Sequence, residues 1–334
     1  MAIKYLIIRF SSIGDIVLTT PAVRGLKEQV DEAEVHYLTK PGYAAILNEN
    51  PYIDKVHVLQ SSFAKTIQNL KAEEFDYIID LHRNLRSIQI KHKLKVMDFS
   101  FNKLNKEKWL MVNFKINKMP DEHIVDRYLK TLSVFDVKND GKGLDYFIPA
   151  SEEIEISTIL PENYKEGYAA FAIGGQHATK KLPTSSIQEI CHKFDKPVVL
   201  LGGKEDHQAG EIIAGNNQMI FNACGMFSLH QSASLIKKAR LVITHDTGLM
   251  HIAAAFHKPV LSVWGNTIPE FGMTPYLPEG GSHMFEVRNL RCRPCTKIGY
   301  KKCPKKHFKC MKDQDINAIV RHAAKVYNTM ESGQ

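Results

Sequence analysis

The sequence predicts an α/β protein with two doubly wound, parallel-sheet lobes. Short apolar runs alternate with amphipathic stretches along the whole chain, which is typical of repeated strand–helix units. Runs such as YLII and VVLL are continuous instead of alternating, so helices are expected on both faces of each sheet. The chain has 334 residues, which is beyond the size at which a single hydrophobic core usually divides.

The elements follow one another in the order expected for two such lobes. In the first half the predicted strands are 5–10, 34–38, 56–59 and 76–82, with helices at 15–29 and 43–48. In the second half the predicted strands are 167–175, 196–203, 218–223, 239–244 and 258–265. The stretch 136–156 between the halves is rich in turn formers and charge. We therefore place a boundary near residue 155, with lobes at 1–155 and 156–334.

Composition restricts the class of protein. Hydrophobic residues make up 44% of the chain and charged residues 24%, which is ordinary for a globular protein. No segment approaches the roughly 20 apolar residues of a membrane span, and the N-terminal MAIKYLIIRF lacks a signal-peptide cleavage site. The sequence therefore predicts a cytoplasmic protein.

Positive charge is unevenly distributed. The net charge is +8, and the stretch 86–118 holds nine Lys and Arg residues against Asp98 and Glu107. Such a stretch suits the phosphates of a substrate, an anionic membrane surface or nucleic acid, and a solvated basic face is the alternative. Because the sequence has no recognisable nucleic-acid-binding module, we predict that nucleic acid is not a partner.

Four of the six cysteines crowd into one segment, CRPCTKIGYKKCPKKHFKC, at Cys292, Cys295, Cys303 and Cys310. A cytoplasmic setting disfavours disulfides, and four thiolates suit a structural zinc ion. The second pair lacks the usual short spacing of zinc ligands. Structural zinc, reduced cysteines that pack or line a loop, and redox chemistry all remain open.

In doubly wound sheets, ligands bind outside the carboxyl ends of the strands, so the residues after each strand are candidates for a site. Asp15 follows the first strand at the start of a helix, where it is either an N-cap or a carboxylate able to remove a proton. Lys180 or Lys181 follows the strand GYAAFAIGG and either neutralises a phosphate or lies exposed. Glu205 follows KPVVLLGG and either accepts hydrogen bonds from a nucleotide or complements a helix dipole.

The strongest local signal is THDTGLMHIAAAFHKPVLSVWGNT, residues 244–267. Asp246, Thr247 and Gly248 form a turn between an apolar strand and a helix, so the helix N-terminus would point its amides at a diphosphate. His251 lies one turn beyond Thr247 on the same helix face. The alternative is an N-cap with a core histidine. Walker and G-x-G-x-x-G spacings do not occur in the sequence, which disfavours P-loop hydrolysis and nicotinamide chemistry.

Taken together, SSIGDIVLTTPAVR, GGKED, DTGLMHIAAAF, LSVWGNT and CRPC resemble the bacterial ADP-heptose:lipopolysaccharide heptosyltransferase family, in order, from about residue 3 to 328. The resemblance implies the GT-B architecture, in which two Rossmann-like lobes face each other over an interlobe cleft. It places the acceptor on the N-terminal lobe and the nucleotide sugar on the C-terminal lobe. It also implies that the last helix, expected at 316–327, crosses back to the N-terminal lobe.

The resemblance also assigns roles to residues. It implies that Asp15 is the general base, that Lys180 binds the diphosphate, and that Arg83 and Arg86 hold acid groups of the acceptor. The nucleotide-sugar contacts fall on Glu205, Asp246, Thr247, Gly248 and His251. The implied reaction is inverting, metal-independent transfer of heptose from ADP-heptose to the inner core of lipopolysaccharide, with no catalytic cofactor. Because that acceptor is lipid-anchored, peripheral association with the inner face of the inner membrane is expected.

Three other functions stay open at this point. A transferase of the same family would use another nucleotide sugar. A GT-B-like nucleotide-sugar epimerase would release the nucleotide without needing an acceptor. A nucleotide-dependent adaptor would have no enzymatic activity, so Asp15→Asn would leave its function unaffected.

Overall fold

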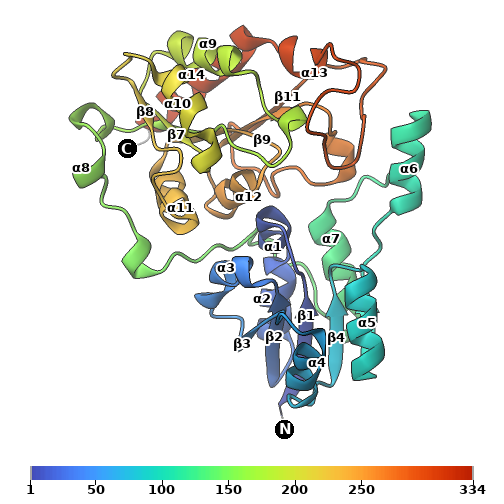
Figure 1. Cartoon of the computed structure of the whole chain (residues 1–334). Coiled ribbons are helices and arrows are strands. Elements are labelled where there is room, and N and C mark those ends of the chain that lie inside the picture. Colours follow the sequence, from blue (N-terminus) through green and yellow to red (C-terminus); the bar gives the residue numbers. More distant parts are fainter. Residues whose placement is uncertain (1, 333–334) are drawn as a thin grey trace. The chain divides into compact units, whose positions relative to one another are not determined.

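The structure is a computed structural model that describes residues 2–332 (Figure 1). The chain forms two compact units. Unit 1 contains the residues up to Leu104 together with Glu122–Phe147, and unit 2 contains Asn105–Asp121 together with the residues from Ile148 onward. The chain therefore enters unit 2 once, through α6 (Asn105–Phe114), before unit 1 is complete.

Unit 1 is built on a five-stranded, all-parallel sheet in the order β3-β2-β1-β4-β5. Its strands are β1 (Ile3–Ile8), β2 (Ala33–Thr39), β3 (Lys55–Val58), β4 (Tyr77–Asp80) and β5 (Met97–Ser100). Its helices are α1 (Ile13–Val17), α2 (Thr20–Gln29), η1 (Pro41–Tyr43), α3 (Ala45–Asn48), α4 (Phe63–Lys71), α5 (Leu85–Leu94), α7 (Ile124–Leu129) and η2 (Lys130–Phe135). The strand order reverses between β1 and β4, so the carboxyl ends of these two strands mark the topological switch point where ligands bind in such sheets.

Helices cover both faces of this sheet, as the continuous apolar strands predict. Leu6, Ile8 and Ile78 pack with Ile67 of α4 and Ile90 of α5 on one face. On the other face α2 packs against β2 and α7. The strand interior is therefore buried on both sides, which explains why the sequence shows apolar runs instead of alternation.

The single helix predicted over 15–29 is wrong, because the chain breaks it into α1 and α2. Pro21 at the start of α2 has no N–H to donate to the preceding turn. Two threonine hydroxyls donate hydrogen bonds to backbone carbonyls at the break. Thr19 Oγ1 donates to Ile16 O at 2.6 Å, and Thr20 Oγ1 donates to Val17 O at 2.8 Å. The helix predicted over 43–48 is also shorter, since η1 precedes α3.

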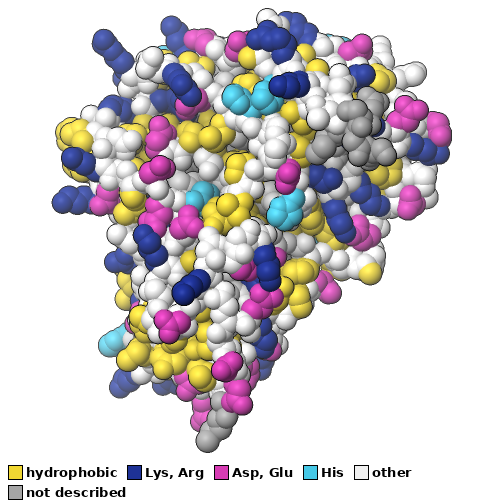
Figure 2. All heavy atoms as spheres, turned by 180° about the vertical axis from the view of Figure 1, so that it is seen from behind, with side chains coloured by type: hydrophobic (Ala, Val, Ile, Leu, Met, Phe, Trp, Pro, Cys, Tyr) yellow, Lys and Arg dark blue, Asp and Glu magenta, His cyan; other side chains and the backbone are white. Residues whose placement is uncertain are grey.

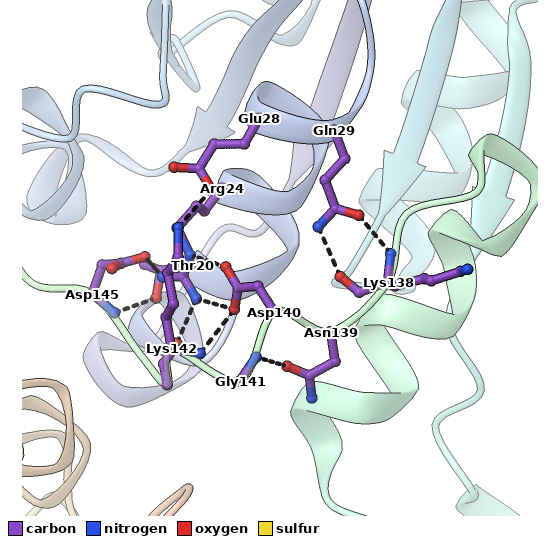
Figure 3. Close-up of polar contacts among 11 residues, drawn as sticks. Thr20, Arg24, Glu28, Gln29, Lys138, Asn139, Asp140, Gly141, Lys142 and Asp145 are labelled. Carbon is purple, nitrogen blue, oxygen red and sulfur yellow. Dashed lines mark hydrogen bonds and ion pairs between the residues drawn. The ribbon is translucent and has the colours of Figure 1, made fainter.

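The end of unit 1 is tied to α2 by one buried arginine (Figure 3). Arg24 has a side chain that is 1% exposed; its Nε and Nη2 donate to Asp140 at 2.7 and 2.9 Å, and its Nη2 also donates to Gly143 O at 2.9 Å. Its Nη1 pairs with Asp145. Burial alone would lower the pKa of Arg24, but the two carboxylates raise it, so the guanidinium stays charged. This network fixes the turn-rich segment 138–145 against the helix.

Unit 2 is built on a six-stranded, all-parallel sheet in the order β11-β10-β9-β6-β7-β8. Its strands are β6 (Ala169–Ala172), β7 (Val198–Leu201), β8 (Ile220–Asn222), β9 (Leu241–His245), β10 (Val260–Trp264) and β11 (His283–Glu286). Besides α6, its helices are η3 (Ala150–Glu152), α8 (Ile156–Ile159), η4 (Glu162–Tyr164), η5 (Ala178–Lys180), α9 (Thr184–Phe194), η6 (Lys204–Asp206), α10 (His207–Ala214), α11 (Leu229–Lys238), α12 (Gly248–Ala255), η7 (Pro269–Phe271), α13 (Lys309–Lys312) and α14 (Ile316–Ser332). This order is the Rossmann order, with its switch point between β6 and β9.

The helices of unit 2 also cover both faces of their sheet. Phe171 and Ile243 pack with Ile190 of α9 and Ile319 of α14 on one face. Ala170 and Val242 pack with residues of α11 and α12 on the other. The last helix, α14, packs against α9 and β9 within its own unit, and its crossing back to the N-terminal lobe stays a prediction.

Two surface properties bear on the expected partners. Among residues 2–332, none of the helices combines the length and the apolar character that a membrane crossing needs. Figure 2 shows Lys and Arg side chains interspersed with Asp and Glu over the described residues of the face in view.

Candidate functional site

Asp15 lies just beyond the carboxyl end of β1, in the first turn of α1. Ser12 is the N-cap residue of α1, and its backbone N–H and Oγ–H donate to Asp15 Oδ2 at 3.1 and 2.8 Å. The interpretation of Asp15 as the N-cap is therefore wrong, because Asp15 is the third helical residue and reaches back to the cap. Its side chain is 21% exposed, so the carboxylate is not fully buried.

Arg9, which no sequence pattern indicated as a site residue, contacts the other carboxylate oxygen of Asp15. Arg9 Nη2 lies 2.6 Å from Asp15 Oδ1, its Nε donates to Ser11 O at 2.9 Å, and its Nη1 donates to Leu81 O at 2.6 Å and Tyr128 Oη at 2.9 Å. Burial alone would lower the pKa of Arg9, but the Asp15 carboxylate raises it, so the arginine stays charged. A fixed cation beside a carboxylate favours its ionised form. We call Arg9, Ser12 and Asp15 the carboxylate corner.

The neighbouring turn, after β4, carries the two predicted acceptor-binding arginines. Asp80 organises it by accepting from the backbone N–H of His82 at 3.0 Å and of Arg83 at 2.6 Å. Arg83 is exposed and its Nη1 donates to Phe101 O at 3.1 Å, while Arg86 is exposed on the first turn of α5. Burial and the nearby Arg9 lower the pKa of His82 to about 4, so its ring is neutral at pH 7. The structure thus places Arg83 on the turn after β4 and Arg86 in the first turn of the following helix α5, both beyond the carboxyl end of β4.

In unit 2 the loops after three strands converge on one ion pair. Lys180 Nζ, from the loop after β6, lies 2.6 Å from Asp246 Oδ2 after β9, and Thr267 Oγ1 after β10 donates to the same oxygen at 2.9 Å. The Lys180 and Asp246 side chains are 18% and 12% exposed. We call Lys180, Asp246 and Thr267 the lysine corner. It stands at the β6–β9 switch point, where the sequence predicted a diphosphate.

Helix α12 begins beside the lysine corner. Thr247 is its N-cap residue in extended conformation, with its Oγ1 3.3 Å from Thr244 Oγ1. Gly248 is the first helical residue, so the first backbone amides, which have no acceptor within the helix, belong to this turn. A Cβ on Gly175 would lie 3.4 Å from the Thr247 side chain, so the loop after β6 lies next to the start of α12. His251 is 2% exposed inside the packed face of α12, which agrees with a core position.

The second lysine of the loop, Lys181, is held elsewhere. Its Nζ lies 2.9 Å from Asp206 Oδ1, a carboxylate that is 2% exposed and that also accepts from Gly203 N at 3.1 Å. The backbone N–H of Leu182 donates to His245 Nε2 at 3.0 Å. Burial and the nearby Lys181 lower the pKa of His245 to about 3, which keeps the acceptor nitrogen unprotonated. Glu205, the predicted nucleotide contact, is exposed on η6 beside Asp206.

The four clustered cysteines do not form a tetrahedral ligand set in this structure. Cys292 Sγ lies 3.8 Å from His307 Nε2, and Cys295 donates to Cys292 O at 3.1 Å. Burial raises the pKa of Cys295 to about 11 and of Cys310 to about 12, so without a bound metal both thiols are protonated at pH 7. Among the residues described, no three of these sulfurs lie within 4.8 Å of one another. Structural zinc at these cysteines stays a prediction from the sequence.

The two corners offer complementary chemistry. Unit 1 presents an ionised carboxylate able to accept a proton, and unit 2 presents a cation and helix amides able to stabilise an anion. Each stands at the switch point of its own Rossmann-like sheet, where ligands bind in such sheets.

Comparison with known proteins defines the class and then the family. The structure resembles that of a family 9 glycosyl transferase from Veillonella parvula (TM-score 0.79, 18% identity, 98% of this chain and 97% of that one). It also resembles ADP-heptose lps heptosyltransferase II from E. coli (TM-score 0.76, 17% identity, 98% of this chain and 100% of that one). These matches confirm the predicted GT-B fold of the glycosyltransferases.

Sequence comparison gives the family. Lipopolysaccharide heptosyltransferase 1 from Campylobacter coli is 25% identical over 291 residues, which cover 79% of this chain and 84% of the relative. The model of glycosyltransferase family 9 (heptosyltransferase) matches residues 63–306. The chain belongs to this family, and the protein is a glycosyltransferase.

Proposed function

We propose that the protein transfers heptose from ADP-heptose to a hydroxyl of the inner core of lipopolysaccharide. The observation that carries the proposal is the lysine corner beside the start of α12, because a cation and helix amides at a Rossmann switch point suit a nucleoside diphosphate. The sugar and the acceptor are taken from what the relatives are named for, a lipopolysaccharide heptosyltransferase and an ADP-heptose heptosyltransferase.

In the proposed reaction Asp15 accepts the proton of the acceptor hydroxyl, whose oxygen attacks the anomeric carbon. The bond from that carbon to the ADP oxygen breaks on the opposite face, so the configuration inverts. Lys180 and the amides at Thr247 and Gly248 stabilise the charge that develops on the departing diphosphate. Arg9 keeps Asp15 ionised and oriented until it takes the proton. The scheme uses no catalytic cofactor.

The remaining site residues take supporting roles in this proposal. Asp246 positions Lys180 and Thr267 instead of contacting the diphosphate, because two anions side by side would repel each other. Glu205 accepts hydrogen bonds from the nucleotide, and its exposure leaves it accessible. His251 supports the packing of α12. Arg83 and Arg86 bind acid groups of the acceptor, so acceptor affinity should fall as salt increases.

A thermal-shift panel of ADP-, UDP- and GDP-sugars tests the donor. A ligand at about 100 times its dissociation constant stabilises the folded protein by roughly 2.7 kcal/mol. We expect the large shift from ADP-heptose and from ADP. A large shift from a UDP- or GDP-sugar alone would show that the family member uses another donor. Release of free nucleotide from ADP-heptose without acceptor, at the full rate, would identify an epimerase instead.

We also propose peripheral association with an anionic membrane, through exposed apolar and basic residues of the segment Asn105–Asp121. Trp109 and Phe114 of α6 are 56% and 58% exposed, and Lys106, Lys115 and Lys118 share the segment. Aromatic rings and lysines together suit a lipid headgroup region. Vesicle sedimentation should show binding to anionic and not to neutral vesicles, and Trp109→Ser should weaken it. Ile212→Ser on α10 is the matched control, since Ile212 is also 56% exposed.

A further inference from the structure

A second cluster of ligand-type side chains lies in unit 1, on β2, β3 and the turn after α4. The strand register pairs Leu38 with His57, so His36 and His57 project from neighbouring strands on the same face. His36 Nδ1 lies 2.9 Å from His57 Nε2 and 3.9 Å from Glu73 Oε2. One ligand atom from each of the three residues lies within 4.8 Å of the others.

Glu34 fixes the tautomer of His36. Its Oε1 lies 2.7 Å from His36 Nε2, and because a carboxylate only accepts, Nε2 carries the hydrogen. His36 Nδ1 therefore carries a lone pair, which accepts a hydrogen bond from His57 Nε2 at 2.9 Å, and Glu73 Oε2 lies 3.9 Å from the same nitrogen. A carboxylate behind the far nitrogen is the usual partner of a metal-binding histidine, because it orients the ring and strengthens it as a ligand. Phe75 packs edge-on against the His36 ring at 5.1 Å and holds it further.

We propose that His36 Nδ1, His57 Nε2 and Glu73 Oε2 bind a divalent transition-metal ion of the zinc class, with water as the fourth ligand. Two imidazoles and one carboxylate are a ligand set that zinc accepts. Without a metal, His57 Nε2 carries the hydrogen that it donates to His36 Nδ1. For metal binding that hydrogen moves to His57 Nδ1, so that Nε2 offers a lone pair to the ion. The ion would link β2, β3 and the α4–β4 turn.

Two carboxylates and two lysines lie around the cluster. Glu34 and Glu73 contribute two negative charges, Lys55 Nζ lies 2.6 Å from Glu73 Oε1, and Lys4 Nζ donates to the backbone oxygen of Glu73 at 3.1 Å. Lys55 is 53% exposed, and it occupies the Glu73 oxygen opposite the proposed ligand atom. The cluster lies on β2 and β3, on one side of β1, whereas the switch point lies between β1 and β4. We therefore assign the ion a structural or regulatory role and not a catalytic one.

The test uses untagged full-length protein, stripped with chelator and dialysed. Zn²⁺ binding is measured by isothermal titration, and Co²⁺ binding by absorption, where a thiolate ligand would reveal itself by a charge-transfer band. His57→Gln and Glu73→Gln should each weaken binding at this site at least tenfold, since even loss of an outer partner costs about 10–100-fold. Circular dichroism confirms that each variant is folded.

Two controls separate the proposal from an ordinary ion pair. Lys55→Met also breaks the Lys55–Glu73 pair but removes a competing cation, so it should keep or strengthen metal binding. His92→Gln, at an exposed position of α5, should change nothing. The proposal is overturned if no ion binds, if Co²⁺ shows only thiolate ligands, or if His57→Gln and Glu73→Gln bind metal as well as His92→Gln does.

Discussion

Arg9 is predicted to set the pH range in which Asp15 acts as a base. Arg9 makes hydrogen bonds to two carbonyls and one tyrosine besides its contact of 2.6 Å with Asp15, and it is 8% exposed. Arg9→Gln removes the charge while leaving a side chain able to donate to a carbonyl. An adjacent arginine typically favours the ionised carboxylate by about one to three pH units. Asp15 should therefore become protonated at higher pH in the variant.

The assay is the pH profile of kcat/KM with donor and acceptor. Activity at the acid end requires ionised Asp15, so the acid limb of Arg9→Gln should move upward by about one to three pH units. Arg9→Lys keeps the positive charge but loses the planar set of N–H donors of the guanidinium. The acid limb of its pH profile should therefore stay near that of the natural protein, while kcat falls. Arg9→Gln should also lower the free energy of unfolding, because it breaks a largely buried ion pair. We expect a loss of about 3 kcal/mol, the lower end of the usual range, because Asp15 is partly exposed to water.

Tyr128→Phe is the matched control, because it removes another partner of Arg9 and leaves the Arg9–Asp15 pair intact. It should lower stability without moving the acid limb. If folded Arg9→Gln shows the same acid limb as Tyr128→Phe, Arg9 is only a structural residue and the reasoning fails.

Three further predictions concern unit 2 and the end of unit 1. Lys180→Met should lower kcat by on the order of a hundredfold, which corresponds to roughly 3 kcal/mol. Lys181→Met should lower kcat much less, because Lys181 pairs with Asp206. Equal losses of kcat in the two variants would contradict the role proposed for Lys180. Arg24→Met should lower the free energy of unfolding in urea by about 3–5 kcal/mol, whereas Lys142→Met at the exposed edge of the same network should leave it unchanged. His245 is neutral in the folded protein because burial lowers its pKa to about 3, whereas the histidine of the unfolded chain is protonated below about pH 6.5. The free energy of unfolding should therefore fall by up to about 1.4 kcal/mol per pH unit as the pH drops from about 6.5 toward 3. His245→Gln should reduce this slope.

The sequence predicted the positions of the candidate site better than its internal contacts. Asp15, Lys180 and Asp246 each follow an apolar run, and parallel strands bring their carboxyl ends to one edge of a sheet, so this placement follows from local pattern alone. Arg9 was missed because it directly follows the apolar run YLII, which was read only as a strand, and because its role depends on Leu81 and Tyr128, which are distant in the chain. Such partners become visible only when the strands are ordered in space.

The unpredicted strands have a different cause. β5 (MDFS) and β11 (HMFE) lie at the edges of their sheets and are partly exposed, so they lack the continuous apolar run by which the interior strands were found. The break between α1 and α2 was readable, because Pro21 cannot donate a helical hydrogen bond, but the apolar periodicity on both sides favoured one helix.

The surroundings of Lys180 and Lys181 differ in the structure, although the sequence alone did not indicate which of the two lysines would neutralise a phosphate. Lys180 and Lys181 are equivalent by type and spacing, yet the structure gives each its own carboxylate, Asp246 for Lys180 and Asp206 for Lys181. Asp206 is 2% exposed and also accepts from the backbone of Gly203, so Lys181 balances a charge inside the unit. Asp246 lies just before α12, and its Oδ2 accepts a hydrogen bond from Thr267, after β10, and pairs with Lys180. The Lys180 ammonium group is therefore held at the switch point. A diphosphate there can take Lys180 from Asp246 without leaving that carboxylate unpaired, since Thr267 still donates to it. This difference in surroundings, and not the residue type, is the reason why we propose Lys180 and not Lys181 as the diphosphate-binding lysine.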